Sequence, residues 1–94
     1  MTWIRTIPQS EADEKLLKAL EGQRAFYPKE YATPVQPTSD GGASGIVASH
    51  SLIPDALYHA FSTFGVLMSP ELPLTRRQHE MITTVVSLSN RCFY

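Results

Sequence analysis

Residues 75–90 read TRRQHEMITTVVSLSN, and their spacing predicts an amphipathic helix over residues 76–89. Thr75 is a good N-cap residue, and Gln78 three positions later completes a capping box. At 100° per residue the apolar side chains of this segment share one arc of about 160°. They are Met81, Ile82, Val85, Val86 and Leu88. Polar side chains, Glu80 among them, fall on the opposite side, so the end of the chain is expected to be helical.

The single cysteine of the chain, Cys92, follows this helix closely. Asn90 is expected to break the helix, because Asn tolerates left-handed backbone geometry and caps helices well. Cys92 would then lie at the start of a following helix. The dipole and free N–H groups of a helix N-terminus stabilise a thiolate, and Arg91 would add positive charge. The alternative is that Cys92 is a small buried apolar residue, which is the commoner role of a lone cysteine.

Two further helices are expected upstream. Ser10 is the predicted N-cap of a helix over residues 11–23, in which three leucines form an apolar stripe. Pro54 suits the first turn of a helix over residues 55–68. Apolar residues recur there at spacings of three and four; they are Leu57, Tyr58, Phe61, Phe64, Leu67 and Met68. Pro70 ends this helix, because the residue before a proline disfavours the helical conformation.

Residues 24–45 separate the first two helices and hold three prolines and three glycines in 22 residues. No helical or strand periodicity survives in them. A structureless loop of about 20 residues is uncommon in a small domain, and this one contains Phe26, Tyr27 and Tyr31. We expect a strap whose aromatic residues pack on a neighbouring subunit or on further sequence. Residues 1–9 are expected to form an extended arm, so the sequence predicts an all-α fold of about three helices and one strap.

Composition limits the chain to one small domain that is expected to need assembly for full stability. It has 94 residues, 43% of them apolar, with 8 basic and 9 acidic side chains. It has no basic stripe for nucleic acid, no secretory signal and no run of the ~20 apolar residues that a membrane span needs. One cysteine excludes an internal disulfide. We expect a soluble cytoplasmic chain without nucleic-acid or membrane partners.

Familiar metal and nucleotide motifs do not fit this sequence, so neither a metal nor a cofactor is expected. His79 begins a His-Glu pair like that of a zinc-protease helix, but Thr83 stands where the second histidine would be. His50 and His59 have no partner at a ligand spacing. Residues 40–45, DGGASG, lack the spacing of a phosphate-binding or dinucleotide-binding loop.

Residues 73–94, PLTRRQHEMITTVVSLSNRCFY, resemble the beginning of a family motif. The family is the alkylhydroperoxidase D-like, carboxymuconolactone decarboxylase-like superfamily, and the resemblance is closest to its peroxidase-related branch. Its motif reads Leu-Ser/Thr-x-x-x-x-Glu, an apolar helix, and then Asn-x-Cys-x-x-Cys-x-x-x-His. The matching residues, in order, are Leu74, Thr75, Glu80, Asn90 and Cys92. Residues 3–8, WIRTIP, and residues 48–57, ASHSLIPDAL, also resemble that branch, so the resemblance covers most of the chain.

The resemblance implies a partial helical bundle, a homo-oligomer, and reduction of organic hydroperoxides with electrons from a dithiol donor. It assigns Cys92 to the first cysteine of a redox pair and Glu80 to a proton relay with a histidine. The second cysteine and the histidine would fall at positions 95 and 99. This sequence ends at residue 94 and has Asn90-Arg91 where Asn-Gly is commoner. We therefore expect residues 1–94 to be the N-terminal part of such a domain, weakly active or inactive as they stand.

The chemistry explains why the motif needs two cysteines and an acid. A thiolate attacks the peroxide bond and becomes a sulfenic acid, and a second thiol condenses with it to form a disulfide. The acid and the histidine move the protons. Twelve residues separate Glu80 from Cys92, which is roughly 18 Å along a straight helix, so they would meet only if the chain reversed. With one cysteine, a sulfenic acid or a mixed disulfide with an outside thiol is the expected product.

Two other functions remain open. The chain could be a non-catalytic helical oligomerisation module, with the apolar faces of residues 55–68 and 76–89 as partner surfaces. It could also be a relative of the carboxymuconolactone decarboxylases. That branch does not need the cysteine pair, so the Asn-x-Cys sequence at residues 90–92 argues against it.

Overall fold

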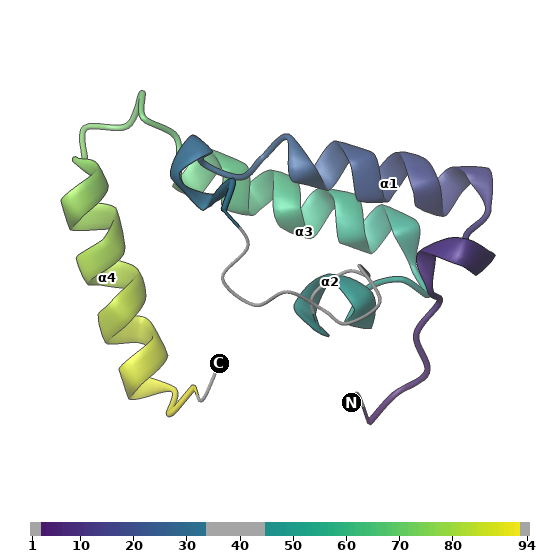
Figure 1. The fold of residues 1–94 in the computed structure, drawn as a ribbon. Helices are drawn as coiled ribbons and strands as arrows, with labels where there is room; N and C mark the ends of the chain where they lie inside the picture. The colour runs from purple at the N-terminus through teal and green to yellow at the C-terminus, as the bar shows by residue number, and fades with distance from the viewer. Residues whose placement is uncertain (1–2, 34–44, 93–94) are drawn as a thin grey trace.

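A computed structural model describes residues 3–33 and 45–92 (Figure 1). These residues form helices and connecting segments, with no strand among them, which confirms the predicted all-α class. In chain order the elements are η1 (Gln9–Glu11), α1 (Glu14–Arg24), η2 (Lys29–Tyr31), α2 (Gly45–Ser49), α3 (Pro54–Leu67) and α4 (Arg76–Ser89). The two η elements are single 3₁₀ turns, and α2 is a short helix additional to the three that were expected.

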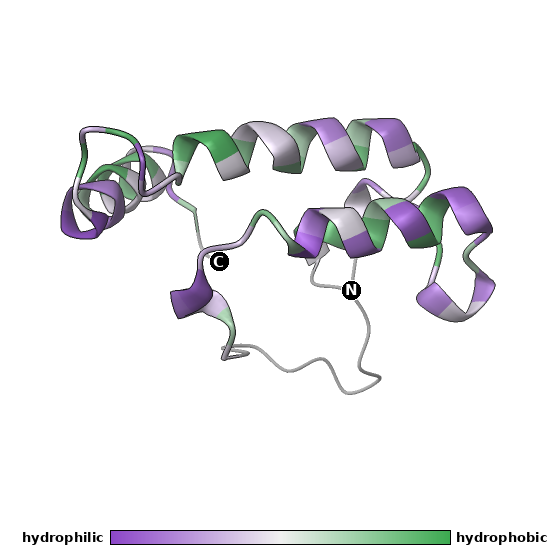
Figure 2. Ribbon diagram, turned by 90° about the horizontal axis from the view of Figure 1, so that it is seen from above, coloured by the Kyte–Doolittle hydropathy of each residue, from purple (hydrophilic) through white to green (hydrophobic). Residues whose placement is uncertain are grey.

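Helices α1 and α3 lie side by side and form the core (Figures 1 and 2). They run in the same direction: Lys15 pairs with Asp55 near their first residues, and Phe26, just past the end of α1, packs on Gly65 near the end of α3. The buried apolar residues of the cluster are Leu16, Ala19, Leu20, Val47, Leu57 and Phe61. Leu57 is 0% exposed, so the centre of the core lies between the two helices.

The first helix begins later than the sequence predicted. Its N-cap is Asp13, not Ser10, and the Asp13 carboxylate accepts a hydrogen bond from the Leu16 N–H at 2.8 Å. Ser10 lies instead inside η1, because the Pro8 carbonyl accepts a hydrogen bond from the Glu11 N–H at 2.9 Å and closes that turn. Both residues are good caps, and the turn after Pro8 decides between them.

The other two predicted helices agree with the structure. α3 is shifted by one residue from the predicted range 55–68, and α4 has the predicted range. The capping box at the start of α4 is present: the Thr75 hydroxyl accepts from the Gln78 N–H, and the Gln78 side chain accepts from the Thr75 N–H. The capping residues and the apolar spacing within this segment are therefore enough to predict the bounds of α4.

The described beginning of the strap packs on α3 of its own chain. The ring of Tyr27 lies 5.3 Å from that of Phe64 and 5.9 Å from that of Phe61. A Cβ atom at Gly65 would lie 2.9 Å from the Cβ of Phe26, so the close approach of the strap requires glycine there. Residues 34–44 of the strap lie outside the described part of the chain.

The N-terminal arm is attached to the start of α3. Residues 5–8 have no regular secondary structure, and the Ile7 N–H donates a hydrogen bond to the buried Ser51 hydroxyl at 2.8 Å. The Ile7 side chain packs against the core cluster. The arm therefore covers the side of the core near α2.

Helix α4 stands apart from the α1–α3 pair (Figure 1). Its first turn contacts the rest of the molecule, and His79 is buried there. Its apolar side chains are all more than half exposed; they are Met81, Ile82, Val85, Val86 and Leu88, which we call the α4 apolar face. At about 100° per residue, this face and Glu80 point in nearly opposite directions. The polar side of α4 thus faces the strap, and its apolar side faces away from the molecule.

None of the described helices is both long enough and apolar enough to cross a lipid bilayer.

Candidate functional site

Glu80 is held in place by a side chain from the strap. The Tyr31 hydroxyl donates a hydrogen bond to Glu80 Oε1 at 2.7 Å. Tyr31 is the last residue of η2, and Glu80 lies in the second turn of α4, so this bond joins two segments that are 49 residues apart. An O–H donor that reaches a carboxylate at this distance makes a strong, charge-assisted bond.

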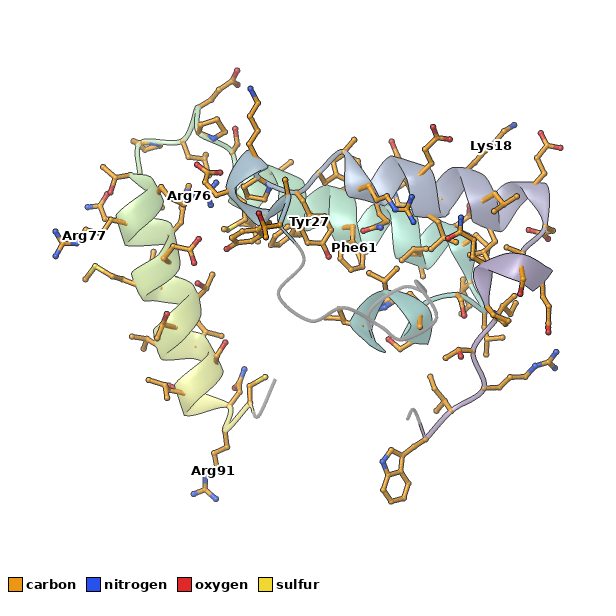
Figure 3. All side chains as sticks on the ribbon, in the orientation of Figure 1. Lys18, Tyr27, Phe61, Arg76, Arg77 and Arg91 are labelled. Atoms are coloured by element: carbon orange, nitrogen blue, oxygen red, sulfur yellow. The ribbon has the colours of Figure 1, made fainter. Side chains whose placement is uncertain are left out.

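Arg76 completes a cluster around this hydrogen bond. Its guanidinium lies 3.7 Å from Glu80 Oε1 and 3.6 Å from Glu30 Oε2, and it stands over the Tyr31 ring at 5.9 Å from the centroid. Figure 3 shows Arg76 turned toward the strap and Arg77 turned away from it. Both ion pairs are longer than a hydrogen bond, so Arg76 contributes mainly charge and stacking, while Tyr31 supplies the directional bond.

The cluster raises the pKa of Tyr31 above its ordinary value of 10.0. Partial burial is the largest cause, followed by the hydrogen bond to Glu80 and the negative charge of that residue; Arg76 acts in the opposite direction. Tyr31 therefore remains a neutral hydrogen-bond donor at neutral pH. Folding favours the protonated phenol, so its contribution to stability is present below about pH 10 and is lost as the pH rises through the raised pKa.

His79 precedes Glu80 on α4, but its side chain is buried and does not join the hydrogen bonds and ion pairs of this cluster. Its side chain is 4% exposed, and its Nε2 atom is buried without a hydrogen-bond partner among the described residues. Within residues 3–33 and 45–92, no group of three or more potential ligand side chains could hold a metal ion. The burial of His79 anchors the first turns of α4 to the rest of the molecule.

Cys92 is a free, exposed thiol at the far end of α4. Its backbone N–H donates to the Ser87 carbonyl at 2.8 Å, and the Arg91 N–H donates to the Leu88 carbonyl at 3.0 Å. These two bonds form a Schellman motif. Cys92 therefore belongs to the motif that ends α4, and the helix expected after it would lie outside the described residues.

The left-handed residue of this motif is Arg91, with φ 51°, and not Asn90, whose φ is −81°. Asn90 instead takes the C-cap position with φ still negative. The helix thus ends at Asn90 as predicted, while the left-handed residue is the one that follows it. Glycine adopts that geometry without steric cost.

Replacing Arg91 with glycine is expected to stabilise the chain by about 1 kcal/mol, because it removes the steric cost of a positive φ. The midpoint of urea unfolding, followed by circular dichroism, should rise. Arg77→Gly is the matched control: it also replaces an exposed arginine of this region, but inside the helix, where glycine costs about 1 kcal/mol. Equal loss of stability in both variants would show that Arg91 carries no strain.

The structure does not bring Glu80 and Cys92 together. α4 continues without interruption from Arg76 to Ser89, so the chain does not reverse between them. The separation is therefore the roughly 18 Å of a straight helix. A cavity of about 480 Å³ lies beside Arg76, lined by Phe26, Tyr27, Met68 and neighbouring residues, and neither Glu80 nor Cys92 lines it.

Sequence reasoning identified Glu80 but missed its partners. Arg76 precedes Glu80 by four residues, and opposite charges at that spacing on a helix commonly pair, so this contact could have been predicted. Tyr31 and Glu30 come from the strap, where no periodicity gave a signal. Their contact with α4 depends on the tertiary fold.

No family model, no curated protein and no solved structure matches this chain. The resemblance to the alkylhydroperoxidase D-like family therefore rests on the motif residues alone.

Proposed function

We propose that this chain carries the acid and the first thiol of a thiol-dependent hydroperoxide reductase. The observation that supports this function best is that the Glu80 carboxylate is fixed while the Cys92 thiol is exposed. Glu80 is bound by Tyr31 at 2.7 Å and flanked by Arg76, whereas the thiol of Cys92 is free and exposed. A carboxylate with a fixed position and a thiol open to substrate are what proton transfer and peroxide attack require.

The proposed reaction balances with one cysteine and an outside thiol. The Cys92 thiolate attacks the terminal oxygen of a hydroperoxide; the S–O bond forms, the O–O bond breaks, and the released alkoxide takes a proton to give an alcohol. A donor thiol then condenses with the sulfenic acid, releasing water and leaving a mixed disulfide. A second donor thiol reduces this disulfide, which restores Cys92 and oxidises the donor pair.

Glu80 does not reach Cys92 along α4, so its proton must travel through a further group. In the resembled family that group is a histidine. Because Glu80 lies on the side of α4 that faces the strap, the proposal places the histidine on a segment that approaches from this side. A chain without that segment is expected to reduce peroxide slowly, with water molecules in place of the histidine between Glu80 and the reacting oxygen.

The test is consumption of cumene hydroperoxide by the purified chain in the presence of excess dithiothreitol. We expect slow turnover that Cys92→Ser abolishes. The control is the double variant Cys92→Ser with Ser89→Cys, which keeps one exposed thiol at the same end of α4 but moves it off the motif position. If the double variant matches the wild type, the reaction is ordinary thiol oxidation and the proposal fails; it also fails if Cys92→Ser retains full turnover.

A second candidate function is self-association through the α4 apolar face. The observation that favours it is the outward orientation of this face, on a helix whose polar side already contacts its own chain. At about 100° per residue, Arg77 in the first turn lies at the edge of this face. An antiparallel pairing of two copies would keep the two Arg77 residues at opposite ends, whereas a parallel pairing would bring them together. The proposed occupant is therefore a second copy of this chain, antiparallel along α4.

A further inference from the structure

We infer that Tyr31 is a positioning residue for Glu80: its hydroxyl fixes the Glu80 carboxylate on the strap-facing side of α4. The role in catalysis rests on the proposed function, but the positioning itself does not. On an exposed helix, a glutamate side chain samples several rotamers, and holding it in one of them requires a directional partner. Tyr31 supplies that partner at 2.7 Å, while the Arg76 contact at 3.7 Å is too long for a hydrogen bond.

Tyr31 can act in this way because it is itself fixed. Its backbone N–H donates to the Pro28 carbonyl at 3.0 Å, which closes η2. Its ring lies 6.4 Å from that of Tyr27, and Tyr27 packs on Phe61 and Phe64 of the core helix α3. Arg76 covers the Tyr31 ring at 5.9 Å. The position of the Glu80 carboxylate is thus linked to the core through the neighbouring rings of Tyr31 and Tyr27.

The same phenol can connect Glu80 to bulk water. Tyr31 is 39% exposed, so part of this residue remains open to solvent while its hydroxyl bonds the carboxylate. Burial and Glu80 raise the pKa of Tyr31, so the phenol can donate to the carboxylate throughout the neutral pH range. Glu30, near Arg76, adds negative charge that also disfavours the phenolate.

Tyr31→Phe tests the positioning directly, because it removes only the hydroxyl. We expect the Glu80 Hα–Hβ couplings measured by NMR, which report one rotamer in the wild type, to move to averaged values. Tyr58→Phe is the matched control: Tyr58 is 41% exposed and its ring packs on Phe26, away from Glu80. Glu80 couplings that are already averaged in the wild type, or unchanged in Tyr31→Phe, would overturn the inference. Equal urea midpoints for both variants would exclude general loss of structure.

The pH profile of peroxide reduction tests the catalytic consequence. We expect Tyr31→Phe to lower turnover about tenfold at neutral pH, because a misplaced group costs rate even when it is retained. The ratio of wild-type to variant turnover should fall toward one as the pH rises above 10, where the wild-type phenol ionises; a purely structural contact would leave the ratio constant. If the wild type shows no turnover, the proposed function fails, and the couplings still decide whether Tyr31 positions Glu80.

Discussion

Leu57→Ala is expected to destabilise the chain by about 3 kcal/mol, within the range measured when a buried leucine is truncated to alanine. Leu57 is 0% exposed and belongs to the cluster that joins α1 to α3. Truncation removes buried apolar atoms and leaves a cavity that two packed helices close only in part. A core of this size supplies only a few kcal/mol, so most molecules of the variant should be unfolded at about 37 °C.

The measurement is a urea titration of the helical signal in circular dichroism. Leu67→Ala is the matched control, because it makes the same substitution on the same helix at a position that is 61% exposed. Its free energy of unfolding should change by no more than about 0.5 kcal/mol. If Leu57→Ala cost no more than Leu67→Ala, the α1–α3 contact would not be the core of this chain.

Val85→Lys is expected to abolish self-association, which the proposed antiparallel pairing of two α4 helices predicts for the wild type. Val85 is 61% exposed and lies in the middle of the α4 apolar face. An antiparallel two-fold axis near this residue would place the two introduced ammonium groups close together and bury both. The combined cost of lost apolar burial and of unpaired buried charge is expected to raise the dissociation constant at least about 100-fold.

Sedimentation velocity over a series of protein concentrations measures the self-association of the wild type and of the variant. The sedimentation coefficient of the wild type should rise with concentration, while that of Val85→Lys should stay at the monomer value. Ser87→Lys adds the same charge to the same helix on its polar side and should associate like the wild type. A wild type that remains monomeric at high concentration, or a Val85→Lys variant that still associates, would rule out this interface.

The sequence was most informative where structure is decided locally. The range of α4 follows from Thr75, Gln78 and a sustained apolar stripe, and all of these act within one helix. The first residue of α1 was harder to predict, because Ser10 and Asp13 are equally good N-cap residues. The turn closed by the Pro8 carbonyl leaves Asp13 as the N-cap. Contacts between residues close in sequence could thus be predicted, unless two similar local signals competed.

The candidate site was predicted only in part. Glu80 and Cys92 were identified because they match a motif, whereas Tyr31 was seen only as an aromatic residue of the strap. Its bond to Glu80 spans 49 residues and depends on how η2 lies against α4. No periodicity or spacing in one sequence encodes such a pair. A helical wheel predicts that α4 has an apolar face. It does not predict whether that face points toward the rest of the molecule or away from it.

The common direction of α1 and α3 has a consequence for how this chain folds. Two antiparallel helices can be joined by a few residues, but a parallel pair requires the connection to return along the length of a helix, about 20 Å for the 14 residues of α3. The segment between Arg24 and Pro54 makes that return, so topology rules out a tight turn between the two helices. Closing so long a loop before the core forms costs entropy, and long-range contacts slow folding. We therefore expect this chain to fold more slowly than a helical hairpin of equal size.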